Sequence, residues 1–81
     1  MFAIFMTTDL KDIWLKDSIS DTVEDLANYV NANREKLNKA AGPNGDWSVH
    51  HYEPNTRKSL KELAITREEA SQLDKLIDWK S

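Results

Sequence analysis

Two adjacent histidines, His50 and His51, are the side chains of this sequence best suited to acid–base or metal chemistry. Residues 47–52 around them are rich in strand-favouring types, and neighbouring side chains of a strand point to opposite faces. The two imidazoles are therefore poorly placed to share one metal ion, unlike two histidines one helical turn apart. No spacing links either histidine to a serine nucleophile. We expect one histidine to be half-buried and hydrogen-bonded and the other to face solvent.

Several other kinds of functional site are excluded or made unfavourable because the chain lacks the residues that they need. The 81 residues include no cysteine, which excludes disulfides, thiolate nucleophiles and zinc–thiolate sites. The acids between residues 9 and 25 have no glycine among them, and a calcium loop needs one for its sharp turn. The Gly42–Gly45 turn does not match a phosphate-binding loop. The sequence therefore predicts a protein that is not an enzyme and has no cofactor or metal.

The charges are unevenly distributed along the chain, although the formal net charge is only −3. Acids outnumber bases in residues 1–33, and bases outnumber acids in residues 34–67. A surface of one sign steers a charged partner, and tryptophan, which occurs three times, is enriched at interface hot spots. These features favour a protein-binding domain, such as an inhibitor, adaptor or regulator. Its candidate contact residues are Asp17, Asp21, Glu24, Asp25 and Trp79.

A nucleic-acid-associated module is the alternative interpretation. Aromatic residues on a strand, with bases at the rim, form platforms for single-stranded nucleic acid. Such a group occurs in and after residues 47–52, although the net negative charge of the chain opposes this function. The candidate residues are Trp47, His50, Tyr52, Arg57, Lys58 and Lys61.

These side chains must be positioned by a small number of elements. Residues 2–6 are apolar at every position, which predicts a buried strand, either a central strand covered on both faces or one packed on a helix. Both an internal position and an open edge that pairs with a second copy are compatible with this pattern. Residues 13–15 predict a second strand, bounded by Asp12 and by residues 16–18, and the short loop between the two strands favours an antiparallel hairpin. A third strand is predicted over residues 47–52.

Two amphipathic helices are predicted. The first covers residues 21–40, with Asp21 as its N-cap and with Gly42 and Pro43 as its stop. The second covers about 67–79 and begins with a capping box whose cap is Thr66. Residues 56–65 are compatible with a short helical turn or with a fourth short strand.

The sequence as a whole predicts one α+β domain over residues 1–81. We expect a small antiparallel sheet of about three strands, with two helices, or three, on one face, in the order β-β-α-β-(α)-α. The apolar start is too short for a signal peptide or a membrane span, so we expect a cytoplasmic monomer or homodimer with a protein partner and no membrane contact. In architecture, the chain resembles small accessory or inhibitor proteins of phages and mobile elements, such as inhibitors of host defence systems.

Overall fold

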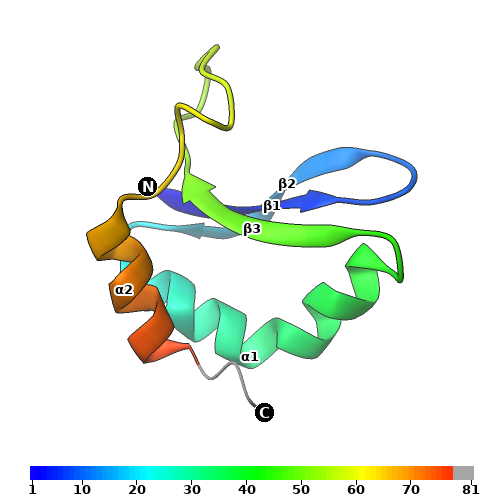
Figure 1. Ribbon diagram of the computed structural model, residues 1–81, viewed down its shortest axis with the longest axis horizontal. Helices are drawn as coiled ribbons and strands as arrows, with labels where there is room; N and C mark the ends of the chain where they lie inside the picture. The colour runs from blue at the N-terminus through cyan, green and yellow to red at the C-terminus, as the bar shows by residue number, and fades with distance from the viewer. Residues whose placement is uncertain (78–81) are drawn as a thin grey trace.

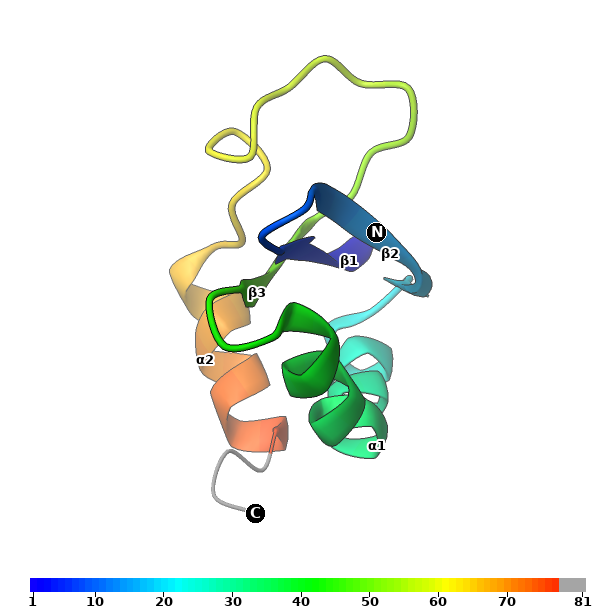
Figure 2. The same ribbon diagram turned by 90° about the vertical axis from the view of Figure 1, so that its right-hand side faces the viewer.

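The computed structural model describes residues 1–77 and confirms an α+β fold with strands and helices in the order β-β-α-β-α (Figure 1). The helices lie together on one face of the sheet, as predicted (Figures 1 and 2). The elements are β1 (Phe2–Thr7), β2 (Asp12–Ser20), α1 (Val23–Ala41), β3 (Asp46–His51) and α2 (Arg67–Leu76).

The sheet has the strand order β2-β1-β3, and both neighbours of β1 run antiparallel to it. The central position of β1 agrees with its apolar sequence, because a central strand of a covered sheet exposes neither face to water. The predicted hairpin of β1 and β2 is confirmed, with Met6 opposite Ile13 and Phe5 opposite Trp14.

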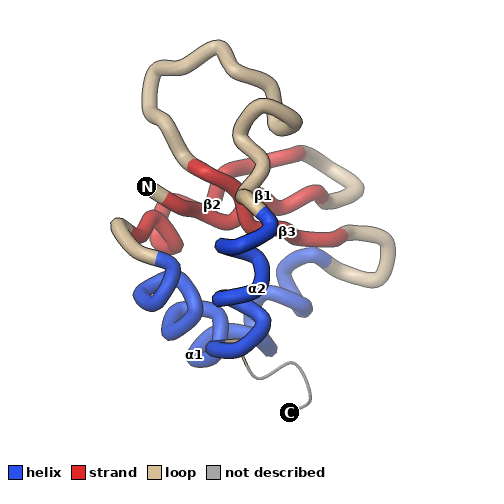
Figure 3. Tube along the Cα trace, turned by 60° about the vertical axis from the view of Figure 1, so that its left-hand side comes forward, coloured by secondary structure: helices blue, strands red, loops and turns tan. Residues whose placement is uncertain are grey.

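The core lies between the sheet and the two helices (Figure 3). Ile4 and Met6 from β1 are fully buried against Leu26 and Val30 of α1. Burying each of these side chains stabilises the fold by about 1.5–3 kcal/mol. Leu73 of α2 completes the same cluster, so the second helix is held mainly by its apolar stripe.

Helix α1 begins at Val23, two residues after the predicted start, and its N-cap lies one residue later than predicted. Thr22, not Asp21, is the N-cap, and its hydroxyl oxygen accepts a hydrogen bond from the Asp25 N–H at 3.1 Å. A threonine hydroxyl and a carboxylate are both good caps, so the local sequence alone does not separate them. The helix ends as predicted at the glycine turn, where Gly42 adopts a positive φ of 78°.

A second glycine allows the closest approach between α1 and the sheet. A Cβ atom on Gly45 would overlap the backbone carbonyl oxygens of Ala41 and Thr7. The turn after α1 therefore packs directly on the end of β1, and β3 starts beside it.

Strand β2 is longer than predicted. It runs from Asp12 to Ser20 and continues past Asp17, which the sequence suggested as its end. The ladder with β1 is irregular between Phe2, opposite Ser20, and Ile4, opposite Leu15. Ser18 fills the gap, because its fully buried hydroxyl accepts a hydrogen bond from the Ile4 N–H at 2.8 Å. The same hydroxyl donates to the Leu15 carbonyl at 2.6 Å.

The connection between β3 and α2 projects from the sheet on the side opposite to the helices (Figures 1 and 2). Both predicted forms of residues 56–65 occur in part. The Leu63 N–H donates to the Ser59 carbonyl at 3.1 Å, as in one helical turn, and Ala64 makes a single antiparallel bridge to His50. Residues 60–63 form a turn. The predicted capping box of Thr66 and Glu69 is confirmed.

Helix α2 ends at Leu76, earlier than predicted. Ile77 turns to an extended conformation, with φ −91° and ψ 132°, and is buried in the core. Its burial explains the early end of the helix, because the extended backbone directs the chain toward the core. Of the predicted range, residues 78 and 79 lie outside the described residues.

We predict that Ser18→Ala lowers the free energy of unfolding by about 1–3 kcal/mol, because it leaves the Ile4 N–H buried without an acceptor. Ser20→Ala is the matched control. Its hydroxyl only donates to the Ser18 carbonyl from a half-buried position, so we expect a loss of about 0.5–1 kcal/mol. Urea denaturation followed by circular dichroism measures both, and equal losses would contradict the role of Ser18.

Candidate functional site

The turn between β1 and β2 presents an apolar side chain to solvent. Leu10 is 94% exposed, far more than the other exposed large hydrophobic residues of the described chain. Sequence reasoning missed this residue. The available signal was a lone leucine between Asp9 and Lys11, in a turn where polar residues are usual.

Thr8 holds this turn in one conformation. The Thr8 backbone N–H and hydroxyl both donate to the Lys11 carbonyl, at 2.9 and 2.8 Å. The hydroxyl oxygen also accepts from the N–H groups of Leu10 and Lys11, at 3.2 and 3.1 Å. A longer bond of 3.4 Å joins Asn44 Nδ2 to the Asp9 carboxylate, which connects the hairpin tip to the turn after α1. Leu10 is therefore displayed on a preorganised turn.

The four predicted acidic contact residues within the described chain are all exposed, but they do not share one face. Asp17 lies near Tyr29 at the β2 side of α1, where burial, together with the Asp17 charge, raises the pKa of the tyrosine. Asp25 precedes Tyr29 by one helical turn and so lies on the same side. Glu24 instead borders a groove beside Lys75 of α2. Asp21 lies in the connection between β2 and α1.

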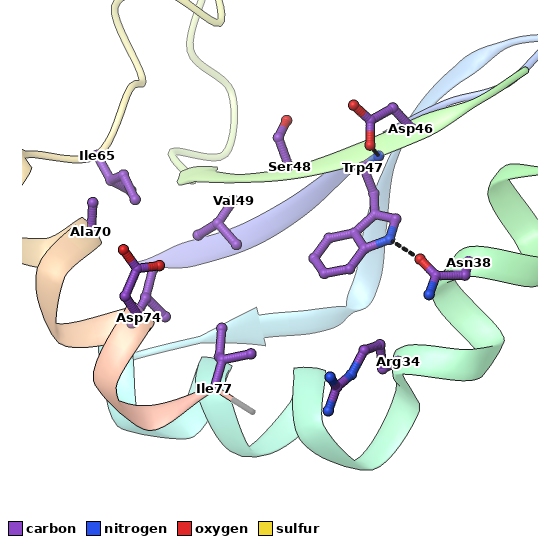
Figure 4. Close-up of a pocket in the computed structure, with 11 residues that line it drawn as sticks. Arg34, Asn38, Asp46, Trp47, Ser48, Val49, Ile65, Ala70, Asp74 and Ile77 are labelled. Carbon is purple, nitrogen blue, oxygen red and sulfur yellow. Dashed lines mark hydrogen bonds between the residues drawn. The ribbon is translucent and has the colours of Figure 1, made fainter. Parts of the chain in front are cut away.

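The predicted nucleic-acid residues are divided between the two faces of the sheet. His50 lies on the face opposite to the helices, in an aromatic cluster with Phe5, Trp14 and Tyr52. Trp47 lies on the helix-covered face, where its indole Nε1–H donates to Asn38 Oδ1 at 2.9 Å (Figure 4). The predicted set therefore does not form one surface.

Sequence reasoning missed two members of the aromatic cluster, Phe5 and Trp14. Their alternation with core residues along β1 and β2 is the signal that identifies them. The ring centroids of Phe5 and Trp14 are 5.1 Å apart with an interplanar angle of 70°, and those of Trp14 and Tyr52 are 5.3 Å apart, also at 70°. Such edge-to-face packing makes the rings a second small core, with no row of parallel faces for bases to stack on.

The predicted basic residues Arg57, Lys58 and Lys61 lie in the exposed connection after β3. Lys58 Nζ is 2.9 Å from a Glu53 carboxylate oxygen, and this hydrogen bond raises the lysine pKa. The connection and the rings of Phe5, Trp14 and Tyr52 enclose a pocket of about 310 Å³. The Lys58–Glu53 pair neutralises one of the three bases beside it.

Both histidines are half-buried and hydrogen-bonded, so the expectation that one of them faces solvent was wrong. The reason is that both faces of β3 are covered here, by α2 on one side and by the connection on the other. His51 Nε2 is 2.8 Å from Glu69 Oε1. Burial raises the pKa of Glu69, but hydrogen bonds from Thr66 and His51 outweigh this effect, so the pKa lies below its usual value.

His50 is in a less favourable position for a charge. Its Nε2 lies 2.7 Å from Ser48 Oγ, while its Nδ1 is buried without a hydrogen-bond partner. Burial among the aromatic rings lowers the pKa of His50; the backbone of Leu60 opposes this shift, although the contact lacks the geometry of a hydrogen bond. His50 is therefore neutral at pH 7.

A groove of about 440 Å³ runs between β3 and the two helices (Figure 4). Trp47, Val49 and Ile77 give it an apolar wall, and Arg34 and Asp74 border it with opposite charges. The Arg34 Nη1 atom is buried without a hydrogen-bond partner. Trp79, the predicted aromatic anchor, lies outside the described residues.

Within residues 1–77, no three histidine, aspartate or glutamate side chains are grouped so that they would hold a metal ion. Neither α1 nor α2 has the length and apolar character of a membrane-crossing helix. Comparison with known protein families, with curated proteins and with solved structures finds no match to this chain in any of the three.

We predict that the free energy of unfolding falls as the pH drops from about 6.5 toward 5. The lowered pKa of His50 means that the unfolded chain binds its proton first, so acid favours unfolding in this window. His50→Gln removes this titration, and its stability should therefore change less over the same range. Urea denaturation at several pH values measures the two slopes, and identical slopes would rule out His50 as the source.

Proposed function

We propose that this protein is a non-enzymatic binding domain for another protein and acts as an inhibitor, adaptor or regulator by occupying part of its partner's surface. The observation that carries the proposal is the exposure of Leu10 on the preorganised tip of the β1–β2 hairpin. A single exposed leucine is common on protein surfaces. A nearly fully exposed leucine on a turn held by several hydrogen bonds is a better candidate for an anchor.

The energetics of such an anchor are favourable. Transfer of a leucine side chain from water into an apolar pocket of a partner is worth about 1.5–3 kcal/mol. The hydrogen bonds of Thr8 already order the turn, so little backbone entropy remains to be lost on binding. At 94% exposure, Leu10 contributes almost nothing to the core of this protein. Its role in binding is therefore separable from the stability of the fold.

The exposed acids supply the second part of the proposal. Asp9 and Asp12 flank the hairpin tip, Asp17 lies on β2, Asp21 in the connection to α1 and Asp25 in the first turn of α1, with the exposed Lys11 and Lys16 among them. Charges of one sign accelerate association with a partner of opposite sign more than they strengthen the final complex. We infer that the partner presents an apolar pocket beside a basic surface.

The setting of this interaction is part of the same proposal. The absence of cysteine from a chain of 81 residues supports a reducing environment such as the cytoplasm. By analogy of architecture alone, the proposal extends to a role among the accessory proteins of phages or mobile elements, such as inhibition of a host defence system.

We predict that Leu10→Ser abolishes capture of the partner from a lysate of the native or host cell and leaves the unfolding free energy unchanged. Leu60→Ser is the matched control, because Leu60 is 36% exposed in the connection after β3. The control should capture the same partner as the original chain. Pull-down with identification by mass spectrometry gives the result, and a partner retained by Leu10→Ser would exclude Leu10 as the anchor.

We also predict that reversing the acids at the start of α1 slows association and flattens its salt dependence, because the charges act mainly on the encounter rate. The variant carries Asp21→Lys, Glu24→Lys and Asp25→Lys. A control with the same change in net charge carries Glu35→Lys, Glu62→Lys and Glu68→Lys, all at exposed positions. Stopped-flow measurements at two salt concentrations give the association rates of both variants with the captured partner. Equal rates for the two variants would remove the steering role of this region.

A further inference from the structure

The outer edge of β2 has no strand partner among the described residues. β2 lies at one side of the sheet, and the only isolated bridge in the described chain joins β3 to Ala64 on the opposite side. An open edge presents unpaired N–H and C=O groups, to which another strand can add.

The direction of these groups follows from the hydrogen bonds of β1. The Ile4 N–H points toward β2, because it donates to Ser18 Oγ. Backbone groups alternate in direction along a strand, so those of Phe5 point toward β3. Trp14, opposite Phe5, therefore directs its own N–H and C=O away from β1, to the open edge. The backbone groups of Asp12 have the same direction, since they lie two residues away.

The side chains along this edge are complementary to their own reversed copy. The segment reads Asp12-Ile13-Trp14-Leu15-Lys16. In an antiparallel pair centred on Trp14, each Asp12 lies opposite Lys16 of the other copy, and the two Trp14 residues lie opposite each other. Neither Asp12 nor Lys16 has an ion-pair partner among the described residues, so both charges are available.

The same register also matches the apolar residues on the other face. Ile13 lies opposite Leu15 of the second copy, and both side chains are half-buried against the core. Together with Tyr29 they line a shallow groove between β2 and α1. Cross-strand apolar pairs and pairs of opposite charge each contribute about 0.2–1 kcal/mol. A two-fold axis doubles every one of these contacts except that of the central residue.

We propose that two copies of this chain associate through antiparallel pairing of β2 with β2, centred on Trp14, and form one continuous sheet. Charged residues on an edge strand ordinarily oppose pairing with other strands. Here the opposite signs at positions 12 and 16 favour one antiparallel register, because a shift of two residues separates both Asp12–Lys16 pairs. The pairing of β2 with β1 becomes irregular after Leu15, so the regular segment of β2 that can pair with a second copy is short and lies around Trp14. This inference is independent of the role of Leu10, which lies outside the paired residues.

Sedimentation velocity over a range of protein concentrations tests the pairing. The chain should sediment at low concentration as a monomer of 9.3 kDa and at high concentration with twice that mass. Asp12→Lys places the new lysine opposite Lys16 of the other copy and should keep the chain monomeric. Lys16→Asp places the new aspartate opposite Asp12 of the other copy and should also keep the chain monomeric. Glu68→Lys is the control, because it changes the net charge as Asp12→Lys does but lies on α2; it should dimerise as the original chain does.

Charge exchange tests the register itself. An equimolar mixture of Asp12→Lys and Lys16→Asp places opposite charges at both pairs and should form a heterodimer. The double variant, which carries both changes in one chain, should recover the homodimer. An original chain that stays monomeric at millimolar concentration, single variants that still dimerise, or a mixture that stays monomeric would each overturn the proposed pairing.

Discussion

The burial of β1 on both faces is the constraint on which the rest of this structure depends. One face, with Ile4 and Met6, is covered by the two helices. The opposite face, with Ala3 and Phe5, is covered by an aromatic cluster and by the connection after β3. Neither cover reaches the outer edge of β2 or the hairpin tip, where Leu10 is 94% exposed. The proposed contacts lie there for this reason.

The central strand also explains why polar groups are buried where they are. The ladder between β1 and β2 breaks at Ile4, and an unpaired backbone N–H at that depth is costly. Ser18 satisfies it with a side chain and allows β2 to return to the sheet at Ser20. On the other side, the histidines of β3 are enclosed because both faces of the sheet are covered. Their hydrogen bonds to Ser48 and Glu69, and the lowered pKa of His50, follow from that enclosure.

Two of the tryptophans lie on opposite faces of the sheet, one under the helices and one in the aromatic cluster. Trp14 packs edge-to-face in the aromatic cluster, and Trp47, a predicted nucleic-acid residue, hydrogen-bonds to Asn38 on the other face. Most of their surface stabilises this chain. Among the described residues, the most exposed large apolar side chain is instead Leu10, in a turn where neither strand nor helix covers it.

Periodicity and caps along the sequence were sufficient for the element order, the apolar stripe of α1 and the capping box at Thr66, because each depends on residues close together in the chain. The separation of Trp47 from His50 and Tyr52 follows from the alternation of side chains along the third strand. The extension of β2 past Asp17, the packing of Trp14 on Tyr52 and the exposure of Leu10 were not predictable in that way. They depend on which distant segments meet: Ser18 with Ile4, Trp14 with Tyr52, and the turn after α1 with the hairpin tip. Local patterns specify which face of an element is apolar, and contacts between elements specify which apolar and polar groups remain uncovered.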